Sequence, residues 1–389
     1  MATARRVALV RSAQSICAAD RLPSNPGRAS RVHALVDAFG LSKGIAVIEP
    51  ELMTDAALAA FHSEEYIACL FGQGADMSDC SDSDGGSPES TNDARSRHEM
   101  FGLVDDCAPF EGLEEYVRFA AGGTVVAARA LADDKAQVAI HWEGGRHHCQ
   151  RSEAAGFCYV NDVVLGILEL QTRFERVLYV DLDLHHGDGV QDAFAYSRRV
   201  MTVSVHLHER GFYPNSGGSY DEGRGRGAGH SINVPLRRGV RDDTFVRVCV
   251  AVGDCAVQAF APTAVVVQCG CDGLAGDPHR AFGLTADAYC AVVEHVLGWG
   301  RPVLLLGGGG YNRADCARCW ARLTAVACGR SISDAADVPE HRFLADYAPG
   351  FDMATAPAAI GDENTDELIG TTIRAIQRII HSSPRAEPR

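Results

Sequence analysis

The chain alternates short apolar, β-branched runs with longer segments of helical periodicity along most of its 389 residues. Short runs of this kind are typical of strands that are buried on both faces. Strands that alternate with helices predict a largely parallel sheet with helices on both faces, which is an α/β fold. The seven expected strands are Val7–Val10, Val138–Trp142, Val177–Val180, Val200–Val205, Ser231–Val234, Ala264–Gln268 and Val303–Leu306.

No internal repeat or linker interrupts this pattern, so we predict one domain over residues 1–360 rather than two. The expected helices are Arg31–Phe39, Ala56–Phe61, Val117–Ala132, Val160–Leu170, Thr244–Phe260, Ala286–Leu297 and Ala314–Ala327. Residues 361–389 should add a C-terminal helix, from Glu367 to Ile380, and a tail. The polar, acidic segment 74–98 predicts a surface loop.

Composition excludes several classes of protein. A net charge of −15 argues against general nucleic-acid binding and suits a basic partner, although it would also simply favour solubility. We expect no signal peptide and no membrane span, because no apolar run reaches the length that a span needs. The 14 cysteines lie scattered in apolar segments, which predicts reduced thiols in an intracellular protein. The lone C-x-x-C at 316–319 has no second pair, so we expect no structural zinc there.

Acidic and histidine side chains crowd the end of the expected strand Val177–Val180. Asp183 and His185 are two residues apart, so in extended chain they point to the same side and could share one cation. Asp181, two residues before Asp183, should point to the same side and could bind the same ion or a neighbouring one. A loop of hydrogen-bonded carboxylates is the alternative, but such groups are rarely buried unless they are paired or bound to metal.

Three further strands are also followed by chemically active residues. His147 and His148 follow one strand, Asp272 follows another, and Tyr311 follows a glycine run after the last. Each taken alone has a simple structural explanation, such as a cap, a turn or close packing. Together they predict one pocket at the carboxyl edge of the sheet, where ligands bind in open α/β folds.

The residue types at this edge limit the chemistry. Asp183, His185 and Asp272 would give a metal three ligands and leave room for water and substrate, as in catalytic zinc sites. Fe(II) and Mn(II) also suit this mixture of oxygen and nitrogen ligands. A nearby histidine could carry protons, carboxylates could orient that histidine, and a tyrosine hydroxyl could donate to an oxyanion.

Four ordered motifs carry a resemblance to class I zinc-dependent histone deacetylases. These motifs are His147-His148, residues 156–162 (GFCYVND), residues 181–189 (DLDLHHGDG) and residues 307–312 (GGGGYN). The similarity runs from about Val7 to about Asp352. It implies the arginase/deacetylase fold, with an eight-stranded parallel sheet flanked by helices. It also implies hydrolysis of N6-acetyl-lysine in the nucleus and cytoplasm.

The resemblance implies a catalytic role for each matching residue. His148 would be the general base and acid, paired with Asp188. His147 would act electrostatically, paired with Asp181, and Tyr311 would polarise the acetyl carbonyl. The implied zinc ligands are Asp183, His185 and Asp272, with Fe²⁺ as the alternative metal in the cell.

The resemblance also implies substrate and ion sites. The implied substrate-binding residues are Asp106 at the rim, Gly156, Phe157 and Tyr213 along an acyl-lysine channel, His279 at its mouth, and Arg28 near an acetate-release cavity. A potassium ion is expected at Asp181, Asp183, His185, Ser204 and Val205, and a second near Phe194. The implied partners are acetylated lysine-containing tails of histones and other proteins, and hydroxamate inhibitors.

Some positions depart from the family pattern. Arg146 stands where a bulky apolar residue is usual, Tyr213 where a second Phe is usual, and His279 where Met or Leu is usual. Two alternatives stay open: an amidohydrolase for acetylpolyamines or guanidino compounds, and an inactive scaffold within a chromatin complex. Tyr311 and the single-metal pattern count against an arginase-like enzyme, and the retained ligands count against a scaffold.

Overall fold

The computed structural model describes residues 5–72, 95–355 and 360–382, and it contains one sheet of eight parallel strands in the order β2-β1-β3-β8-β7-β4-β5-β6. The strands are β1 Val7–Val10, β2 Ala46–Ile48, β3 Val138–His141, β4 Val177–Asp181, β5 Val200–Leu207, β6 Ser231–Leu236, β7 Ala264–Gln268 and β8 Val303–Leu306. All seven strands expected from sequence are confirmed. The eighth strand, β2, was not expected; it has three residues, lies at the edge of the sheet within the apolar run 45–48 (IAVI), and two of its residues are exposed.

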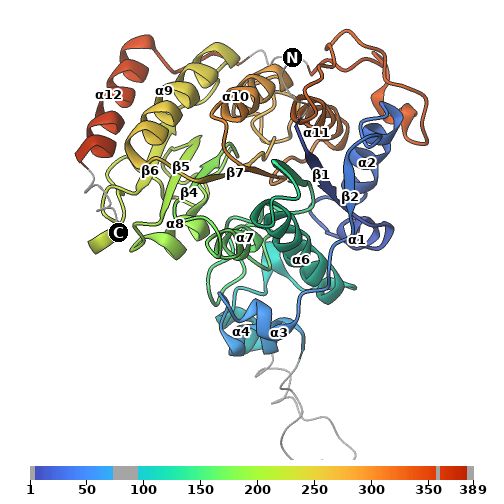
Figure 1. Cartoon of the computed structure of the whole chain (residues 1–389), viewed down its shortest axis with the longest axis horizontal. Coiled ribbons are helices and arrows are strands. Elements are labelled where there is room, and N and C mark those ends of the chain that lie inside the picture. The colour runs from blue at the N-terminus through green and yellow to red at the C-terminus, as the bar shows by residue number, and fades with distance from the viewer. Residues whose placement is uncertain (1–4, 73–94, 356–359, 383–389) are drawn as a thin grey trace, which may run out of the picture.

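Helices cover both faces of this sheet (Figure 1). On one face α2, α11, α10 and α9 pack side by side, and α12 lies outside α9; on the other face α6 packs against α7. Helices α1, α4 and α8 were not expected from sequence. The long helices are α2 Arg28–Ala38, α6 Leu113–Ala132, α7 Asp162–Leu170, α9 Asp242–Phe260, α10 Ala286–Gly298, α11 Arg313–Ala327 and α12 Asp366–Ser382. The short ones are α1 Ala13–Ala19, α3 Asp55–Leu58, α4 Glu64–Leu70 and α8 Asp188–Phe194, with 3₁₀ turns at Asp105–Cys107, Gly225–Gly227 and Leu344–Tyr347.

The side chains of each central strand alternate between two buried cores. In β4, Leu178 and Val180 join the core beneath α9, α10 and α11, whereas Val177 and Tyr179 join the core beneath α6 and α7. Successive residues of a strand point to opposite faces, so a sheet with helices on both faces needs apolar residues at every position. This requirement explains the continuous apolar runs of the sequence.

The strand register aligns the carboxyl ends of five adjacent strands. His141 of β3 pairs with Leu306 of β8, which pairs with Gln268 of β7. Gln268 then pairs with Asp181 of β4, and Asp181 pairs with Ser204 of β5. The loops that follow β3, β8, β7 and β4 therefore leave the sheet side by side from one edge.

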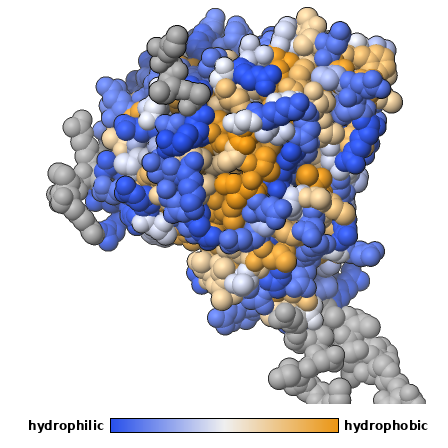
Figure 2. All heavy atoms as spheres, turned by 45° about the vertical axis from the view of Figure 1, so that its right-hand side comes forward, coloured by the Kyte–Doolittle hydropathy of each residue, from blue (hydrophilic) through white to orange (hydrophobic). Residues whose placement is uncertain are grey.

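The remaining features concern the surface and the chain ends. The face in Figure 2 is largely polar around a central apolar area. None of the described helices is long and apolar enough to cross a membrane. The expected terminal helix is present as α12, whose Ile369, Ile376 and Ile380 are buried. Residues 74–94 of the expected 74–98 loop lie outside the described residues, and residues 95–98 are helical rather than loop. The domain boundary at residue 360 stays a prediction.

Candidate metal-dependent active site

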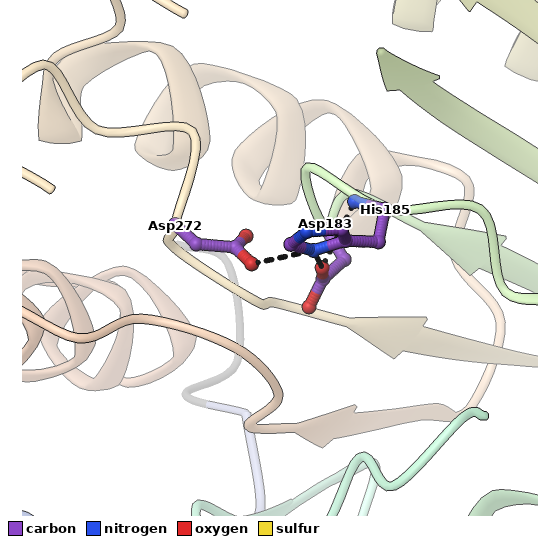
Figure 3. Close-up of side chains that lie close together, drawn as sticks. All are labelled: Asp183, His185 and Asp272. Carbon is purple, nitrogen blue, oxygen red and sulfur yellow. Dashed lines mark hydrogen bonds and ion pairs between the residues drawn. The ribbon is translucent and has the colours of Figure 1, made fainter. Parts of the chain in front are cut away.

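Three buried side chains meet at the carboxyl edge of β4 and β7 (Figure 3). Nδ1 of His185 lies 3.2 Å from Oδ1 of Asp183 and 3.0 Å from Oδ2 of Asp272. One donor atom from each residue lies within 4.8 Å of the others, a grouping that could hold a metal ion. The sequence placed these three residues at one site, and the structure brings them together.

Neighbouring amides fix both carboxylates. Oδ2 of Asp183 accepts hydrogen bonds from the Gln268 side chain and the Gly309 amide, each at 2.8 Å. Oδ1 of Asp272 accepts one from the Leu184 amide at 2.8 Å. A Cβ atom on Gly309 would lie 2.3 Å from Oδ2 of Asp272, so only glycine lets the backbone approach this closely.

The charges of the three groups suit a bound cation. Burial and the nearby Asp183 carboxylate raise the pKa of Asp272 to about 6. Burial opposes protonation of His185, but hydrogen bonds to Asp183 and Asp272 outweigh it and raise the pKa to about 10. Two carboxylates this close repel each other unless a positive charge lies between them. A divalent cation would supply that charge in place of the histidine proton, so this donor set fits a metal.

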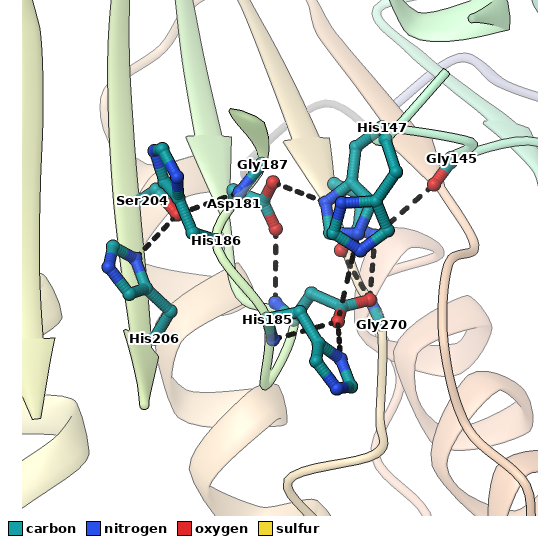
Figure 4. Close-up of polar contacts among 12 residues, drawn as sticks. Gly145, His147, Asp181, His185, His186, Gly187, Ser204, His206 and Gly270 are labelled. Atoms are coloured by element: carbon teal, nitrogen blue, oxygen red, sulfur yellow. Dashed lines mark hydrogen bonds and ion pairs between the residues drawn. The ribbon is translucent and has the colours of Figure 1, made fainter. Parts of the chain in front are cut away.

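Each of two adjacent histidines is paired with its own carboxylate. Nδ1 of His147 lies 2.7 Å from Oδ2 of Asp181, and Nδ1 of His148 lies 2.7 Å from Oδ1 of Asp188. Figure 4 shows the His147 ring facing Asp181. Burial opposes protonation of His147, but Asp181 outweighs it and raises the pKa to about 9. Burial, together with the neighbouring His147, lowers the pKa of His148 to about 4. The two histidines therefore differ in charge at neutral pH.

Aromatic rings and one glycine surround the histidines and the three candidate ligands. The Tyr213 ring lies 4.9 Å from the His148 ring, and the Phe157 ring lies 5.8 Å from the Tyr311 ring. Gly156 faces both His148 and Tyr213, since a Cβ there would lie 2.5 Å from the His148 ring. Burial is the main reason that the pKa of Tyr311 stands well above its usual value, so its hydroxyl keeps its proton.

His279 lies beside this group at a partly exposed position. Its ring centroid is 5.0 Å from that of His185 and 5.0 Å from that of Tyr311. Its Nδ1 lies 2.8 Å from Oδ1 of Asp277, whose other oxygen accepts the Tyr311 amide hydrogen bond at 2.7 Å. Asp277 therefore positions the partly exposed His279 and the partly buried Tyr311 together.

The other site residues expected from sequence are less closely grouped. Asp106 is exposed on the 3₁₀ turn Asp105–Cys107 and acts electrostatically on Tyr213. Arg28 is buried and donates to the Gly310 carbonyl at 2.8 Å. Ser204 and Val205 lie on β5, next to Asp181 of β4. Phe194, at the end of α8, belongs to the core beneath α6 and α7, and no described contact joins it to the three candidate ligands.

Sequence reasoning missed two residues of this site. The Phe212 ring stacks on the His185 ring at 5.1 Å with an angle of 4° between the planes, although only its neighbour Tyr213 was expected there. The Gln268 side chain donates a hydrogen bond to Asp183 and accepts one from the Gly270 amide. A polar residue at the end of an otherwise apolar strand was the available signal for Gln268.

The fold and the site together define an α/β protein with a buried carboxylate–imidazole group that could hold a metal at the carboxyl edge of a parallel sheet. Comparison with known proteins then gives the family. Residues 22–327 match the histone deacetylase domain, and the chain belongs to that family. Its sheet is that of the arginase/deacetylase fold, and the chain is a lysine deacetylase, an amide hydrolase.

Individual relatives support this assignment. The chain is 41% identical to histone deacetylase 8 of Danio rerio, over 96% of this chain and 94% of the relative. It is 40% identical to histone deacetylase 8 of Xenopus tropicalis, over 95% and 96%. Similarity to human histone deacetylase 1 is lower, 36% over 89% of this chain and 69% of the relative. The resemblance found in the sequence motifs is therefore confirmed.

Proposed function

We propose that the chain hydrolyses N6-acetyl-lysine in histone tails and other proteins and releases acetate, using a divalent metal. The observation that carries this proposal is the buried group of Asp183, His185 and Asp272. It lies beside a histidine pair and Tyr311, which are the groups that amide hydrolysis needs for proton transfer and for oxyanion binding. The basic protein tails that would be substrates also suit an acidic enzyme with net charge −15.

The metal we propose is Zn²⁺, with Fe²⁺ as the alternative in the cell, held by Asp183, His185 and Asp272. When bound, such a cation polarises the scissile carbonyl and makes water more acidic. Three protein ligands leave coordination positions for water and substrate. Gln268 and the Gly309 amide would keep Asp183 oriented, because their hydrogen bonds occupy its other oxygen.

His148 would move the proton. Its Nδ1–H donates to Asp188, so Nε2 keeps its lone pair and can take a proton from the attacking water. The same nitrogen can then pass that proton to the departing lysine amine. Asp188 fixes the tautomer and the ring plane, which is the role of an orienting carboxylate.

His147 and Tyr311 would stabilise developing negative charge. His147 is anchored by Asp181, which also accepts a hydrogen bond from the Tyr179 hydroxyl at 2.7 Å. A positive His147 would then lower the energy of an oxyanion formed nearby. The Tyr311 hydroxyl would donate to that oxyanion, and the Asp277 contact with its amide would hold the tyrosine in place.

The remaining residues would hold substrate and monovalent ions. We assign Gly156, Phe157 and Tyr213 to an acyl-lysine channel, where the lack of a side chain at Gly156 leaves room beside His148. Asp106 would hold the substrate backbone at the rim, His279 would flank the mouth, and Arg28 would lie by an acetate-release cavity. Potassium would bind at Asp181, Asp183, His185, Ser204 and Val205, and a second ion near Phe194. We expect hydroxamate inhibitors to bind the metal, and the enzyme to work in the nucleus and cytoplasm.

The experiment that tests this proposal compares substrates on protein loaded with one defined metal. Acetyl-lysine peptides should turn over, with acetate and free lysine formed in equal amounts. Acetylpolyamines and guanidino compounds should turn over at least about 10²-fold more slowly. Preference for acetylpolyamine would overturn the proposal in favour of the amidohydrolase alternative. Peptide binding without turnover would favour a scaffold.

A further inference from the structure

The hydroxyl of Tyr213 places a polar atom in the candidate site at a position where the family usually has the plain ring of Phe. Tyr213 lies in the segment between β5 and β6. A Cβ atom on Gly156 would lie 2.8 Å from this hydroxyl and 2.5 Å from Cδ2 of His148. The Tyr213 hydroxyl and the His148 ring therefore both lie against one glycine.

The Tyr213 hydroxyl is free to bind a ligand. Within residues 5–72, 95–355 and 360–382, no group forms a hydrogen bond with it. Burial, with the nearby Asp188 carboxylate as a further cause, raises the pKa of Tyr213, so the hydroxyl keeps its proton. A protonated phenol can accept one hydrogen bond and donate another. Tyr213 is 40% exposed, so a substrate that displaces solvent from its hydroxyl must itself supply a partner.

Two sets of rings flank His185, and the two tyrosines belong to different sets. The His185 ring lies 6.0 Å from the ring of His148 and 6.1 Å from that of Tyr213. It also lies 5.0 Å from the ring of His279, which contacts the Tyr311 ring at 5.0 Å. No ring contact between described residues joins Tyr213 or His148 to Tyr311. A substrate group held beside His185 would therefore lie between the two tyrosines.

The amide that is cleaved has two polar groups that point in opposite directions. An N6-acyl amide is planar and trans, so its C=O and its N–H diverge. The proposed mechanism places the carbonyl oxygen next to the Tyr311 hydroxyl. The N–H must then face the side of the site that His148 and Tyr213 form. It loses its water there, and a buried donor without an acceptor is costly.

Three acceptors lie on the side that the N–H would face. Nε2 of His148 is needed for the attacking water, because Nδ1 is bonded to Asp188. The carbonyl of Gly156 is contacted by the Cys158 thiol at 3.4 Å. The Tyr213 hydroxyl is the one of these three that no described residue engages and that the proposed mechanism does not use.

We propose that the Tyr213 hydroxyl accepts a hydrogen bond from the N–H of the acyl-lysine amide and so favours amide substrates over the matching esters. This inference rests on the proposed function and adds a substrate-binding role that a Phe ring cannot have. The nitrogen keeps its hydrogen in the bound substrate and in the transition state. The hydrogen bond should therefore act on KM rather than on kcat.

The test compares two peptides on enzyme loaded with one defined metal. One peptide carries N6-acetyl-lysine, and the other carries the ester in which oxygen replaces the N–H. Tyr213→Phe should raise KM for the amide by roughly 3–10-fold, as expected for one lost hydrogen bond, with kcat nearly unchanged. The kinetic constants for the ester should change little. Tyr220→Phe is the control, because Tyr220 is 84% exposed, and it should match the native enzyme with both peptides.

Two results would overturn the role of Tyr213 and leave the proposed function standing. An unchanged KM for the amide in Tyr213→Phe would mean that another acceptor, such as the Gly156 carbonyl, binds the N–H. An equal loss with amide and ester would mean that the hydroxyl acts through His148, and the pH profile of kcat/KM should then shift as well.

Failure of the proposed function would look different, because the native enzyme would not cleave the amide peptide at all, and this inference would fall with it. Tyr213→Phe restores the ring usual in the family, so we expect it to fold. If it does not, Tyr213→Leu also removes the hydroxyl, and its loss of kcat/KM should still be larger with the amide than with the ester. Losses of equal size in Tyr213→Leu would contradict the proposal.

Discussion

At the residue scale, the position of Tyr311 depends on contacts at both of its ends. Asp277 accepts a hydrogen bond from its backbone amide, and the rings of Phe157 and His279 pack around its phenol. Gly310, just before it, has a φ of +124°, a value that side chains rarely adopt. The hydroxyl is thus held in place before substrate arrives, which is the condition for effective oxyanion stabilisation.

Replacing Tyr311 with Phe should lower kcat by roughly 10²-fold while KM for an acetyl-lysine peptide changes little. The substitution removes one donor and almost no volume, so binding of the ground state should survive. Steady-state kinetics on metal-loaded protein measures both constants. The control is Tyr220→Phe, because Tyr220 is 84% exposed. Turnover near that of the native enzyme would remove Tyr311 from the mechanism.

His279 should affect inhibitor choice through the nitrogen that Asp277 leaves free. The hydrogen bond to Asp277 raises the pKa of His279 and holds its Nδ1, so only Nε2 faces a ligand. A protonated His279 would donate from Nε2, which favours hydroxamates that carry an acceptor at the rim. We expect these to bind the native enzyme more tightly than His279→Met by roughly 0.5–1.5 kcal/mol. If the native enzyme and His279→Met bind these hydroxamates with equal affinity at both pH 6 and pH 8, His279 has no role in binding.

At the element scale, His62 connects the segment after α3 to the loop that carries the histidine pair. Its Nε2 accepts the Asn161 amide at 3.0 Å, and its Nδ1 lies 3.2 Å from the Arg151 carbonyl. Asn161 is the N-cap of α7, and its side chain donates a hydrogen bond to the carbonyl of Cys149, the residue after His148. Only a neutral His62 can both accept and donate in this way. The buried His62 imidazole therefore helps to fix the position of the loop that carries His148, the proposed general base.

His62 should make stability depend on pH in a defined window. Burial lowers its pKa from 6.5 to about 4. Above pH 6.5 the imidazole is neutral in both the folded and the unfolded chain and has no effect. As the pH falls from 6.5 to 4, the unfolded chain takes up a proton that the folded chain refuses, so stability falls by up to roughly 3 kcal/mol.

The His62→Gln variant isolates this effect. Denaturant unfolding from pH 7.5 to 4.5 should show a smaller loss of stability in the variant than in the native protein. His381→Gln, on the exposed last turn of α12, is the control and should follow the native curve. Parallel curves for the native protein and His62→Gln would show that His62 does not govern acid stability.

The elements show what the sequence could predict and what it could not. Central strands such as β4 were predictable because burial on both faces demands an unbroken apolar run. β2 was missed although residues 45–48 (IAVI) form an apolar run as long as that of β1, so the signal was present in the sequence. α8 was missed because it begins at Asp188, inside the motif 181–189, whose residues were interpreted as candidate metal ligands and catalytic groups rather than as a helix. Short elements take their structure from tertiary contacts rather than from their own pattern.

At the scale of the whole molecule, the sequence allowed us to predict the three candidate metal ligands but not the residues that hold them in place. Asp183, His185 and Asp272 follow strand ends that the register brings to one edge. Phe212 and Gln268 were missed because their roles depend on which ring or carboxylate the fold places opposite them. The assignment of individual catalytic, substrate and potassium roles stays a prediction that kinetics must test.

The acidic segment 74–98 should attract basic substrates electrostatically, over distances longer than a direct contact. If it steers basic substrates, deleting residues 74–94 should lower kcat/KM for lysine-rich peptides at low salt. The decline of kcat/KM with added salt should then be steeper in the intact enzyme than in the deleted one, because salt screens the attraction. A neutral peptide is the control. The same salt dependence in both proteins would show that the segment does not steer substrate.

The measurement that tests the account most directly is activity against metal content. Removing the metal with a strong chelator should abolish hydrolysis of an acetyl-lysine peptide, and Zn²⁺ or Fe²⁺ should restore it in proportion to metal bound. Asp272→Asn should bind this metal more weakly, because it removes one negative charge from the proposed ligand set. Full activity in protein shown by elemental analysis to be free of metal would contradict the proposed mechanism.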